Sequence, residues 1–309
     1  MRNLYTALLA ALFFSLLLFP LLSGDGGKVI GENALPLPSP SDDGTFKIKT
    51  DEGTISLSEE DYICGVVAAE MPALYESEAL KAQAVAAYTY ACLYRGGSAE
   101  EWDLTDDSSL HQAYISPDER AKKWGENAAV YEEKIRAAVR SVLGEKIYYE
   151  GEPIFAVYHA ISAGHTESAK NIWGKDFPYL CGVPSVGDKE HESFKTTATF
   201  SAEELCKQLK IEKPADLNAV GIKAERSTAG TVLSFTVYGQ SFKGTAVREA
   251  LSLRSANFTA EYKDGSFTFT VLGYGHGVGM SQHGANCLAK EGKTYREILL
   301  TYYPGTEIK

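Results

Sequence analysis

The feature that most constrains this chain is an uncharged apolar run over residues 4–22. As a helix, the run is about long enough to cross a hydrocarbon core of ~30 Å. Arg2 precedes the run, and Asp25 and Glu32 follow it. Because positive residues favour the cytoplasmic side, we predict a cytoplasmic N-terminus over residues 1–3, a single-pass transmembrane anchor over residues 4–23 and an extracytoplasmic remainder.

A cleaved signal peptide is the alternative to an uncleaved anchor, but the residues after the run lack a clear small-x-small cleavage site. Residues 24–45 have the composition of a linker, with Gly26-Gly27 and with prolines at Pro36, Pro38 and Pro40. The folded part is therefore expected over residues 46–309.

Within that part, helical and strand patterns mix without a regular βαβ rhythm, which predicts an α+β domain of helices and antiparallel hairpins. Ser77 is expected to cap one of the helices. The predicted helices cover residues 59–69, 78–94, 126–143, 202–209 and, last, 281–292. The predicted strands cover residues 46–50, 54–57, 146–149, 154–159, 232–238 and 267–272.

Charge and cysteine content exclude several classes of protein. The chain has 41 Asp and Glu residues against 30 Lys and Arg, and its net charge of -11 argues against a surface that neutralises nucleic-acid phosphates. Its five cysteines are an odd number with no CxxC spacing, so neither a disulfide framework nor a zinc ribbon is indicated. Most are expected to be buried as small apolar side chains.

One carboxylate stands out. Glu70 ends an apolar run and precedes Met71-Pro72, where the proline stops the helix. A carboxylate in apolar surroundings holds its proton more strongly, so this position suits a general acid. The alternative is a water-exposed glutamate at a helix end.

Two further segments combine glycines with imidazoles and hydroxyls, namely residues 158–167 and 273–284. The glycines of the second segment fit neither GxGxxG nor a Walker motif, so a nucleotide site is rejected. The histidines invite a metal site, but no pair has HExxH spacing. A serine nucleophile lacks a GxSxG context.

Together these segments resemble the stage II sporulation protein D family, in the family's order and over roughly residues 46–309. The matching segments are Glu70-Met71-Pro72, residues 78–87, Gln112-Ala113-Tyr114, residues 158–168, Trp173-Gly174, residues 178–180, Leu253-Arg254-Ser255, residues 275–282 and residues 302–306. A co-linear set of this kind is far more specific than any single motif.

The resemblance implies a membrane-anchored lytic transglycosylase that cuts peptidoglycan strands already stripped of stem peptides, during engulfment of the forespore. It makes Glu70 the catalytic acid. An ordinary glycosidase needs a second carboxylate, whereas here the sugar's own 6-hydroxyl would attack C1 and close a 1,6-anhydro ring. The implied reaction consumes no water and no cofactor.

The resemblance also implies substrate-binding side chains. His159, Ser162, His276, Ser281 and Gln282 would line the sugar groove as hydrogen-bonding groups. Aromatic residues would stack on sugar faces, and these are Tyr114 and Tyr274.

The sequence departs from the family pattern at several positions. Tyr88 replaces a usual arginine and is expected to remove a positive charge near Glu70. His283 stands where tyrosine is usual, and Ala160 and Ala163 also differ from the pattern. Some relatives bind zinc beside the position of His111, but the neighbouring cysteines are missing here, so no zinc is predicted.

Two alternatives remain open, a non-catalytic glycan-binding enhancer of a cell-wall amidase and a metal-dependent hydrolase. The resemblance implies as partners a sporulation amidase/endopeptidase, which strips the stem peptides, and a polytopic membrane scaffold protein.

Overall fold

The computed structural model describes residues 44–96, 101–212, 214 and 216–309. The predicted transmembrane segment and nearly all of the predicted linker lie outside these ranges. None of the helices in these ranges is both long and apolar enough to cross a bilayer. Residue contacts divide the chain into two units, where the sequence analysis treats residues 46–309 as one domain. Unit 1 comprises the described residues up to Ala156 together with Glu307–Lys309, and unit 2 is Val157–Thr306.

Unit 1 begins with a hairpin of β1 (Thr45–Thr50) and β2 (Gly53–Ser58), joined in parallel by β3 (Leu104–Thr105). The helix α2 (Glu59–Glu70) follows directly, because the Ser58 hydroxyl accepts a hydrogen bond from the Asp61 N–H and caps the first turn. Both the hairpin and this helix were predicted from sequence.

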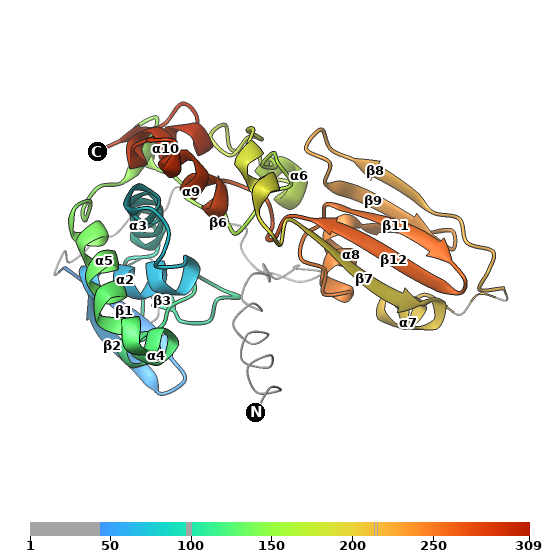
Figure 1. Cartoon of the computed structure of the whole chain (residues 1–309), viewed down its shortest axis with the longest axis horizontal. Helices are drawn as coiled ribbons and strands as arrows, with labels where there is room; N and C mark the ends of the chain where they lie inside the picture. Colours follow the sequence, from blue (N-terminus) through green and yellow to red (C-terminus); the bar gives the residue numbers. More distant parts are fainter. Residues whose placement is uncertain (1–43, 97–100, 213, 215) are drawn as a thin grey trace. The chain divides into compact units, whose positions relative to one another are not determined.

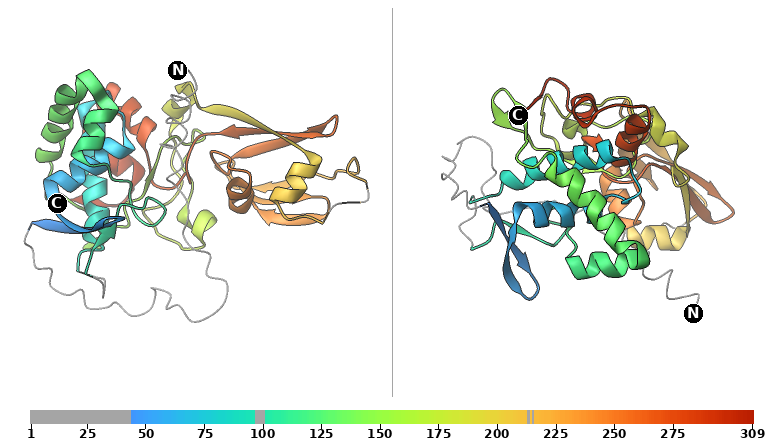
Figure 2. Two further views of the ribbon diagram at one scale, coloured as in Figure 1. Left: turned by 90° about the horizontal axis from the view of Figure 1, so that it is seen from below. Right: turned by 60° about the vertical axis from the view of Figure 1, so that its left-hand side comes forward.

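The buried faces of three helices form the core of unit 1, and Figures 1 and 2 show them lying side by side. They are α2, α3 (Ser77–Cys92) and α5 (Ala128–Arg140). The prediction that Ser77 caps α3 was wrong. Glu76 is the N-cap and makes no side-chain capping bond.

The short helix α4 (Pro117–Trp124) was missed from the sequence, and the 3₁₀ turn η1 (Gly125–Asn127) connects it to α5. Arg120 on α4 is 1% exposed and donates to both oxygens of Glu132 on α5, at 2.7 and 3.0 Å. This bidentate pair is the geometry in which a buried arginine is well satisfied. Unit 1 is completed by a sheet of β4 (Ile147–Tyr149), β5 (Glu152–Pro153) and the C-terminal β14 (Glu307–Ile308).

Unit 2 contains an antiparallel module with its own core. One sheet has β7 (Lys195–Ser201), β11 (Phe258–Lys263) and β12 (Ser266–Leu272), and the other has β8 (Lys223–Arg226), β9 (Val232–Val237) and β10 (Gln240–Lys243). Two helices, α7 (Ala202–Gln208) and α8 (Gly244–Ala250), accompany the sheets.

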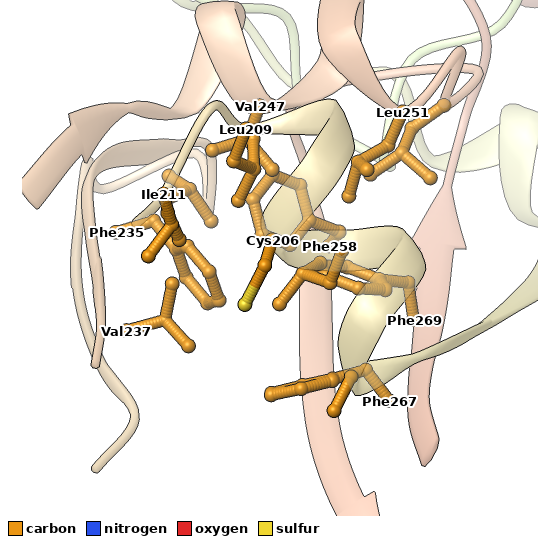
Figure 3. Close-up of a cluster of buried hydrophobic side chains, with 14 of the residues drawn as sticks. Cys206, Leu209, Ile211, Phe235, Val237, Val247, Leu251, Phe258, Phe267 and Phe269 are labelled. Atoms are coloured by element: carbon orange, nitrogen blue, oxygen red, sulfur yellow. The ribbon is translucent and has the colours of Figure 1, made fainter. Parts of the chain in front are cut away.

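Three phenylalanines tie the two sheets of this module together. Phe235, Phe258 and Phe269 lie with ring centroids 5.5 to 6.0 Å apart, in tilted or edge-on arrangements. Aliphatic side chains and Cys206 surround them (Figure 3). Both α7 and the strand β12 were predicted. Burial was predicted for most of the five cysteines, but only Cys64 and Cys206 are buried, and Cys92, Cys181 and Cys287 are partly exposed.

The rest of unit 2 carries the glycine- and histidine-rich segments. Its elements are β6 (Tyr158–His159), α6 (Ala169–Trp173), the 3₁₀ turn η2 (Val186–Glu190), β13 (Met280–Ser281), α9 (Gln282–Lys290) and α10 (Tyr295–Tyr302). The predicted strand over residues 154–159 was too long, because only Tyr158 and His159 pair. The helix α9 was predicted but is not the last, since α10 follows it.

Candidate functional site

Glu70 is the last residue of α2. The helix ends here because Met71, held extended before Pro72, cannot continue it. Residues 62–68 of the helix are buried, whereas Glu70 is partly exposed. Its Oε1 accepts a hydrogen bond of 3.3 Å from the backbone N–H of Ala113. The carboxylate therefore meets solvent at the boundary of an apolar core.

The segment that carries this N–H is held from several sides. The Gln112 amide donates to the Ala87 carbonyl at 3.1 Å, and the Ile115 N–H donates to the Gly65 carbonyl at 3.4 Å. Arg120, already paired with Glu132, also donates to the Ile115 carbonyl at 3.0 Å. These bonds fix the Ala113 N–H beside Glu70.

Tyr114, predicted to stack on sugar, lies in the same segment. Its ring stacks on Tyr62 of α2, with centroids 5.8 Å apart and planes inclined by 18°. The ring occupies space that only a glycine leaves open, because a Cβ on Gly65 would lie 2.2 Å from the Tyr114 ring. Tyr114 is partly exposed. Its contact with sugar stays a prediction.

Lys123 supplies positive charge at this end of α2. Its ammonium donates to the Ala68 carbonyl at 2.8 Å, where the helix dipole favours a cation. Loss of hydration lowers the pKa of Lys123, and the negative charge of Glu70 acts in the opposite direction. Sequence reasoning missed this residue because α4 was not predicted.

Tyr88 does not have the place expected for it. Its hydroxyl donates to Glu59 at 3.0 Å, and Arg95 pairs with the same carboxylate. Glu59 is the first residue of α2 and Glu70 the last, about 16 Å apart along the axis at ~1.5 Å per residue. The expectation that Tyr88 removes a charge near Glu70 is corrected, since Tyr88 belongs to the opposite end of the helix.

The other five predicted site residues all belong to unit 2. There β6 pairs in parallel with β13, with Met280 opposite Tyr158 and Ser281 opposite His159. The residues on either side of this pairing are bridged as well, Ile161 to Tyr274 and Glu167 to Val278. The structure therefore brings together the two segments that the sequence separates by more than a hundred residues.

Two histidines, His159 in this pairing and His276 just before it, have lowered pKa values. His159 is fully buried and donates from Nδ1 to the Val278 carbonyl at 3.0 Å, and burial lowers its pKa to about 4. His276 accepts the Val278 N–H at Nδ1 at 3.1 Å. Burial and the nearby His159 lower the pKa of His276 well below 6.5. The Nε2 atom of His159 is buried without a hydrogen-bond partner among the described residues.

Asp188, which sequence reasoning missed, organises the serines. This carboxylate is 0% exposed and accepts from the Ser281 hydroxyl at 2.8 Å, the Ser185 hydroxyl at 2.8 Å and the Ser162 N–H at 3.0 Å. Ser281 also caps α9 by accepting from the Gly284 N–H. Ser162 and Ser281 therefore have a structural role, and their contact with sugar stays a prediction.

The two remaining residues singled out from the sequence, Gln282 and His111, lie in different units. Gln282 is the first residue of α9 and is 4% exposed. His111 in unit 1 accepts the Thr105 N–H at 3.1 Å, and burial lowers its pKa. Throughout the described ranges, no group of three or more His, Cys, Asp or Glu side chains is arranged to hold a metal ion.

The chain is similar in sequence to known proteins. A family model described as stage II sporulation protein matches residues 52–149, which include α2 and its carboxylate. The stage II sporulation protein D of Bacillus subtilis (strain 168) is 41% identical over 253 residues, covering 81% of this chain and 74% of the relative. The chain belongs to the stage II sporulation protein D family.

Two other members or relatives of the family are informative. The stage II sporulation protein D of Bacillus amyloliquefaciens is 40% identical over 253 residues, covering 81% of this chain and 73% of the relative. An amidase enhancer of Bacillus subtilis (strain 168) is 28% identical over 300 residues, covering 79% of this chain and 40% of the relative. The family thus stands close to a protein named for enhancing an amidase.

Proposed function

We propose that the protein is a lytic transglycosylase that cleaves stem-peptide-free peptidoglycan strands during sporulation. The observation that carries the proposal is the position of Glu70, at the solvent boundary of an apolar helix with a fixed N–H from Ala113 against it. Membership of a sporulation family supports the biological setting.

The proposed chemistry uses one carboxyl group twice. Protonated Glu70 gives its proton to the glycosidic oxygen between N-acetylmuramic acid and N-acetylglucosamine, and the bond from C1 to that oxygen breaks. The 6-hydroxyl of the same muramic acid attacks C1, and its proton goes to the Glu70 carboxylate. The products are a 1,6-anhydro end and a free hydroxyl, so the acid is regenerated.

The surroundings of Glu70 fit both halves of this cycle. Because Glu70 lies at the edge of the apolar core and reaches solvent, its carboxyl group is open to proton exchange with a substrate. After proton transfer, the Ala113 N–H and the ammonium of Lys123 stabilise the carboxylate.

The test is cleavage of purified peptide-free strands by the full chain in detergent, compared with Glu70→Gln. We expect the variant to lose about 10²- to 10⁴-fold in rate while still binding strands, since only the proton donor is removed. Glu133→Gln, an exposed glutamate on α5, is the matched control and should cleave normally. Cleavage retained by Glu70→Gln would contradict the proposal.

A second function, enhancement of an amidase without cleavage, is favoured by the likeness to the amidase enhancer. It predicts that the chain and its Glu70→Gln variant stimulate a purified cell-wall amidase equally, with no cut in the glycan. Release of stem peptides from intact peptidoglycan measures this directly.

The proposed location is the cell membrane, with residues 46–309 outside the cytoplasm and residues 4–23 as the anchor. The proposed partners are the amidase/endopeptidase that prepares the substrate and a polytopic membrane scaffold. Protease protection in spheroplasts tests the location, and co-purification from sporulating cells tests the partners.

A further inference from the structure

Two arginines of unit 2 that are buried or partly buried, Arg248 and Arg254, have no carboxylate partner in the described part of the chain. Arg248 on α8 is 3% exposed, and its side chain makes a single hydrogen bond there, from Nε to the Leu253 carbonyl at 3.3 Å. Arg254 is partly buried, and its guanidinium lies over the Tyr274 ring at 4.2 Å from the centroid. It makes no hydrogen bond from its side chain to a described residue.

Such an arrangement is costly, because buried charges are normally paired. Burial lowers the pKa of Arg248 to about 10 and lowers that of Arg254 as well, so both remain cations at neutral pH. In unit 1 the buried Arg120 pairs with Glu132, and the partly buried Arg95 pairs with Glu59. In unit 2 the exposed Arg226 also lacks a carboxylate, but its guanidinium donates to the Gly230 and Phe258 carbonyls.

The backbone fixes Arg254 beside the glycine-rich segment. Its carbonyl accepts the Gly275 N–H at 3.0 Å. Gly275 has φ of +113°, and a Cβ there would lie 2.8 Å from the Cβ of His159, so no larger residue fits. Stacking occupies the face of the guanidinium and leaves its edge, which carries the N–H donors, for another partner.

A small hollow lies beside the residues that follow Arg254 in the chain. A small hollow of unit 2 is lined by Ser255 and Asn257 on one side and by Gly275 and His276 on the other. Glu167 also lines it, but its oxygens accept from Ser168, Asn171 and Ser227.

We propose that Arg254, supported by the charge of Arg248, binds a carboxylate of the sugar substrate. This inference rests on the proposed function for the class of substrate. In a peptide-free strand the lactyl ether of each N-acetylmuramic acid ends in a free carboxylate, whereas a stem peptide converts that group to a neutral amide. Arg254 would therefore be the residue that distinguishes stripped strands from peptide-bearing ones.

Binding, measured apart from cleavage, tests this directly. The full chain carrying Glu70→Gln is titrated calorimetrically with a peptide-free tetrasaccharide of alternating N-acetylglucosamine and N-acetylmuramic acid. The comparison ligand is the same tetrasaccharide with its lactyl carboxylates converted to N-methylamides by carbodiimide and methylamine. We expect the carboxylate form to bind about tenfold or more tighter, as for a hydrogen bond to a charged group.

Arg254→Gln is expected to bring the ratio of the two affinities close to one while leaving the methylamide affinity unchanged. Arg296→Gln is the matched control, because Arg296 also lies over a tyrosine ring, that of Tyr295, and it should keep the ratio. Arg254→Lys preserves the charge and should retain part of the preference. If the melting curve shows that the glutamine variant does not fold, the affinity ratio of Arg254→Lys tests the inference instead.

Equal affinity for both ligands in the parent, or no binding of either, would overturn the inference. So would an Arg254→Gln variant that weakens both ligands alike, because that result indicates a structural role only. Carboxylate-dependent binding by a chain that never cleaves strands would instead refute the proposed transglycosylase and leave this inference standing.

Discussion

Glu70 in unit 1 and Asp188 in unit 2 are carboxylates that contact backbone N–H groups, but their settings differ. Asp188 has no exposed surface and accepts from two hydroxyls and one N–H, all within 3.0 Å. Glu70 is partly exposed, and its bond to Ala113 is 3.3 Å long. A carboxylate that is completely buried and firmly bonded serves the fold, whereas one that reaches solvent can exchange a proton with a substrate.

The largest effect should come from removing the buried carboxylate. Asp188→Ala leaves two hydroxyls and an N–H without their acceptor, and we expect unfolding to become easier by about 3–5 kcal/mol. Urea denaturation measures the change. The matched control is Asp176→Asn, whose carboxylate forms an exposed pair with Lys170 and should alter stability by less than about 0.5 kcal/mol. A loss of stability at Asp188→Ala no larger than that of the control would contradict the structural role given to Asp188.

The buried histidine should make the stability of unit 2 depend on pH. The pKa of His159 is about 4 in the folded chain against ~6.5 when unfolded, so between these values the unfolded state binds more protons. Stability should therefore fall by on the order of 3 kcal/mol as pH drops from 6.5 to 4. His159→Gln should flatten this slope in denaturation curves recorded across that range. An unchanged slope would mean that His159 is not the group responsible.

A smaller effect is expected beside Glu70. Gly65→Ala places a methyl group against the Tyr114 ring and should cost about 1–3 kcal/mol. By displacing the segment that carries the Ala113 N–H, it should also slow cleavage. Gly221→Ala is the control, because a Cβ at Gly221 meets no atom within 4 Å. Normal cleavage by a destabilised Gly65→Ala chain would show that the segment carrying the Ala113 N–H does not affect the reaction.

The smallest effect concerns the other end of α2. Tyr88→Phe removes one hydrogen bond to Glu59 and should reduce stability by about 1 kcal/mol. Because Glu59 and Glu70 lie at opposite ends of the helix, kcat/KM on peptide-free strands should not change. A large loss of activity in this variant would show that Tyr88 acts at the catalytic end after all.

Local signals explain what the sequence could predict. The hairpin of β1 and β2, the helix α2 and its end before Pro72 all follow from alternation, capping and proline, which act over a few residues. The same signals placed Glu70 at the end of α2, whereas its role as the acid was implied by the family resemblance and stays a prediction. Ser77 was misassigned because a neighbouring residue, Glu76, adopts the capping conformation without a side-chain bond.

Long-range contacts explain what the sequence could not predict. Asp188 is 93 residues from Ser281, and no periodicity connects them. Lys123 contacts Ala68 across 55 residues, from a helix that is only eight residues long. Such partners are set by how the chain folds back on itself, and only the structure identifies them.

The most direct test of the central claim, that Glu70 acts with the sugar's own hydroxyl and without water, is cleavage of peptide-free strands in water enriched in oxygen-18. Mass spectrometry of the new ends then reports the nucleophile. We predict anhydro ends, lighter by one water and free of the label, which disappear with Glu70→Gln. Reducing ends that carry oxygen-18 would contradict the account and identify the protein as a hydrolase.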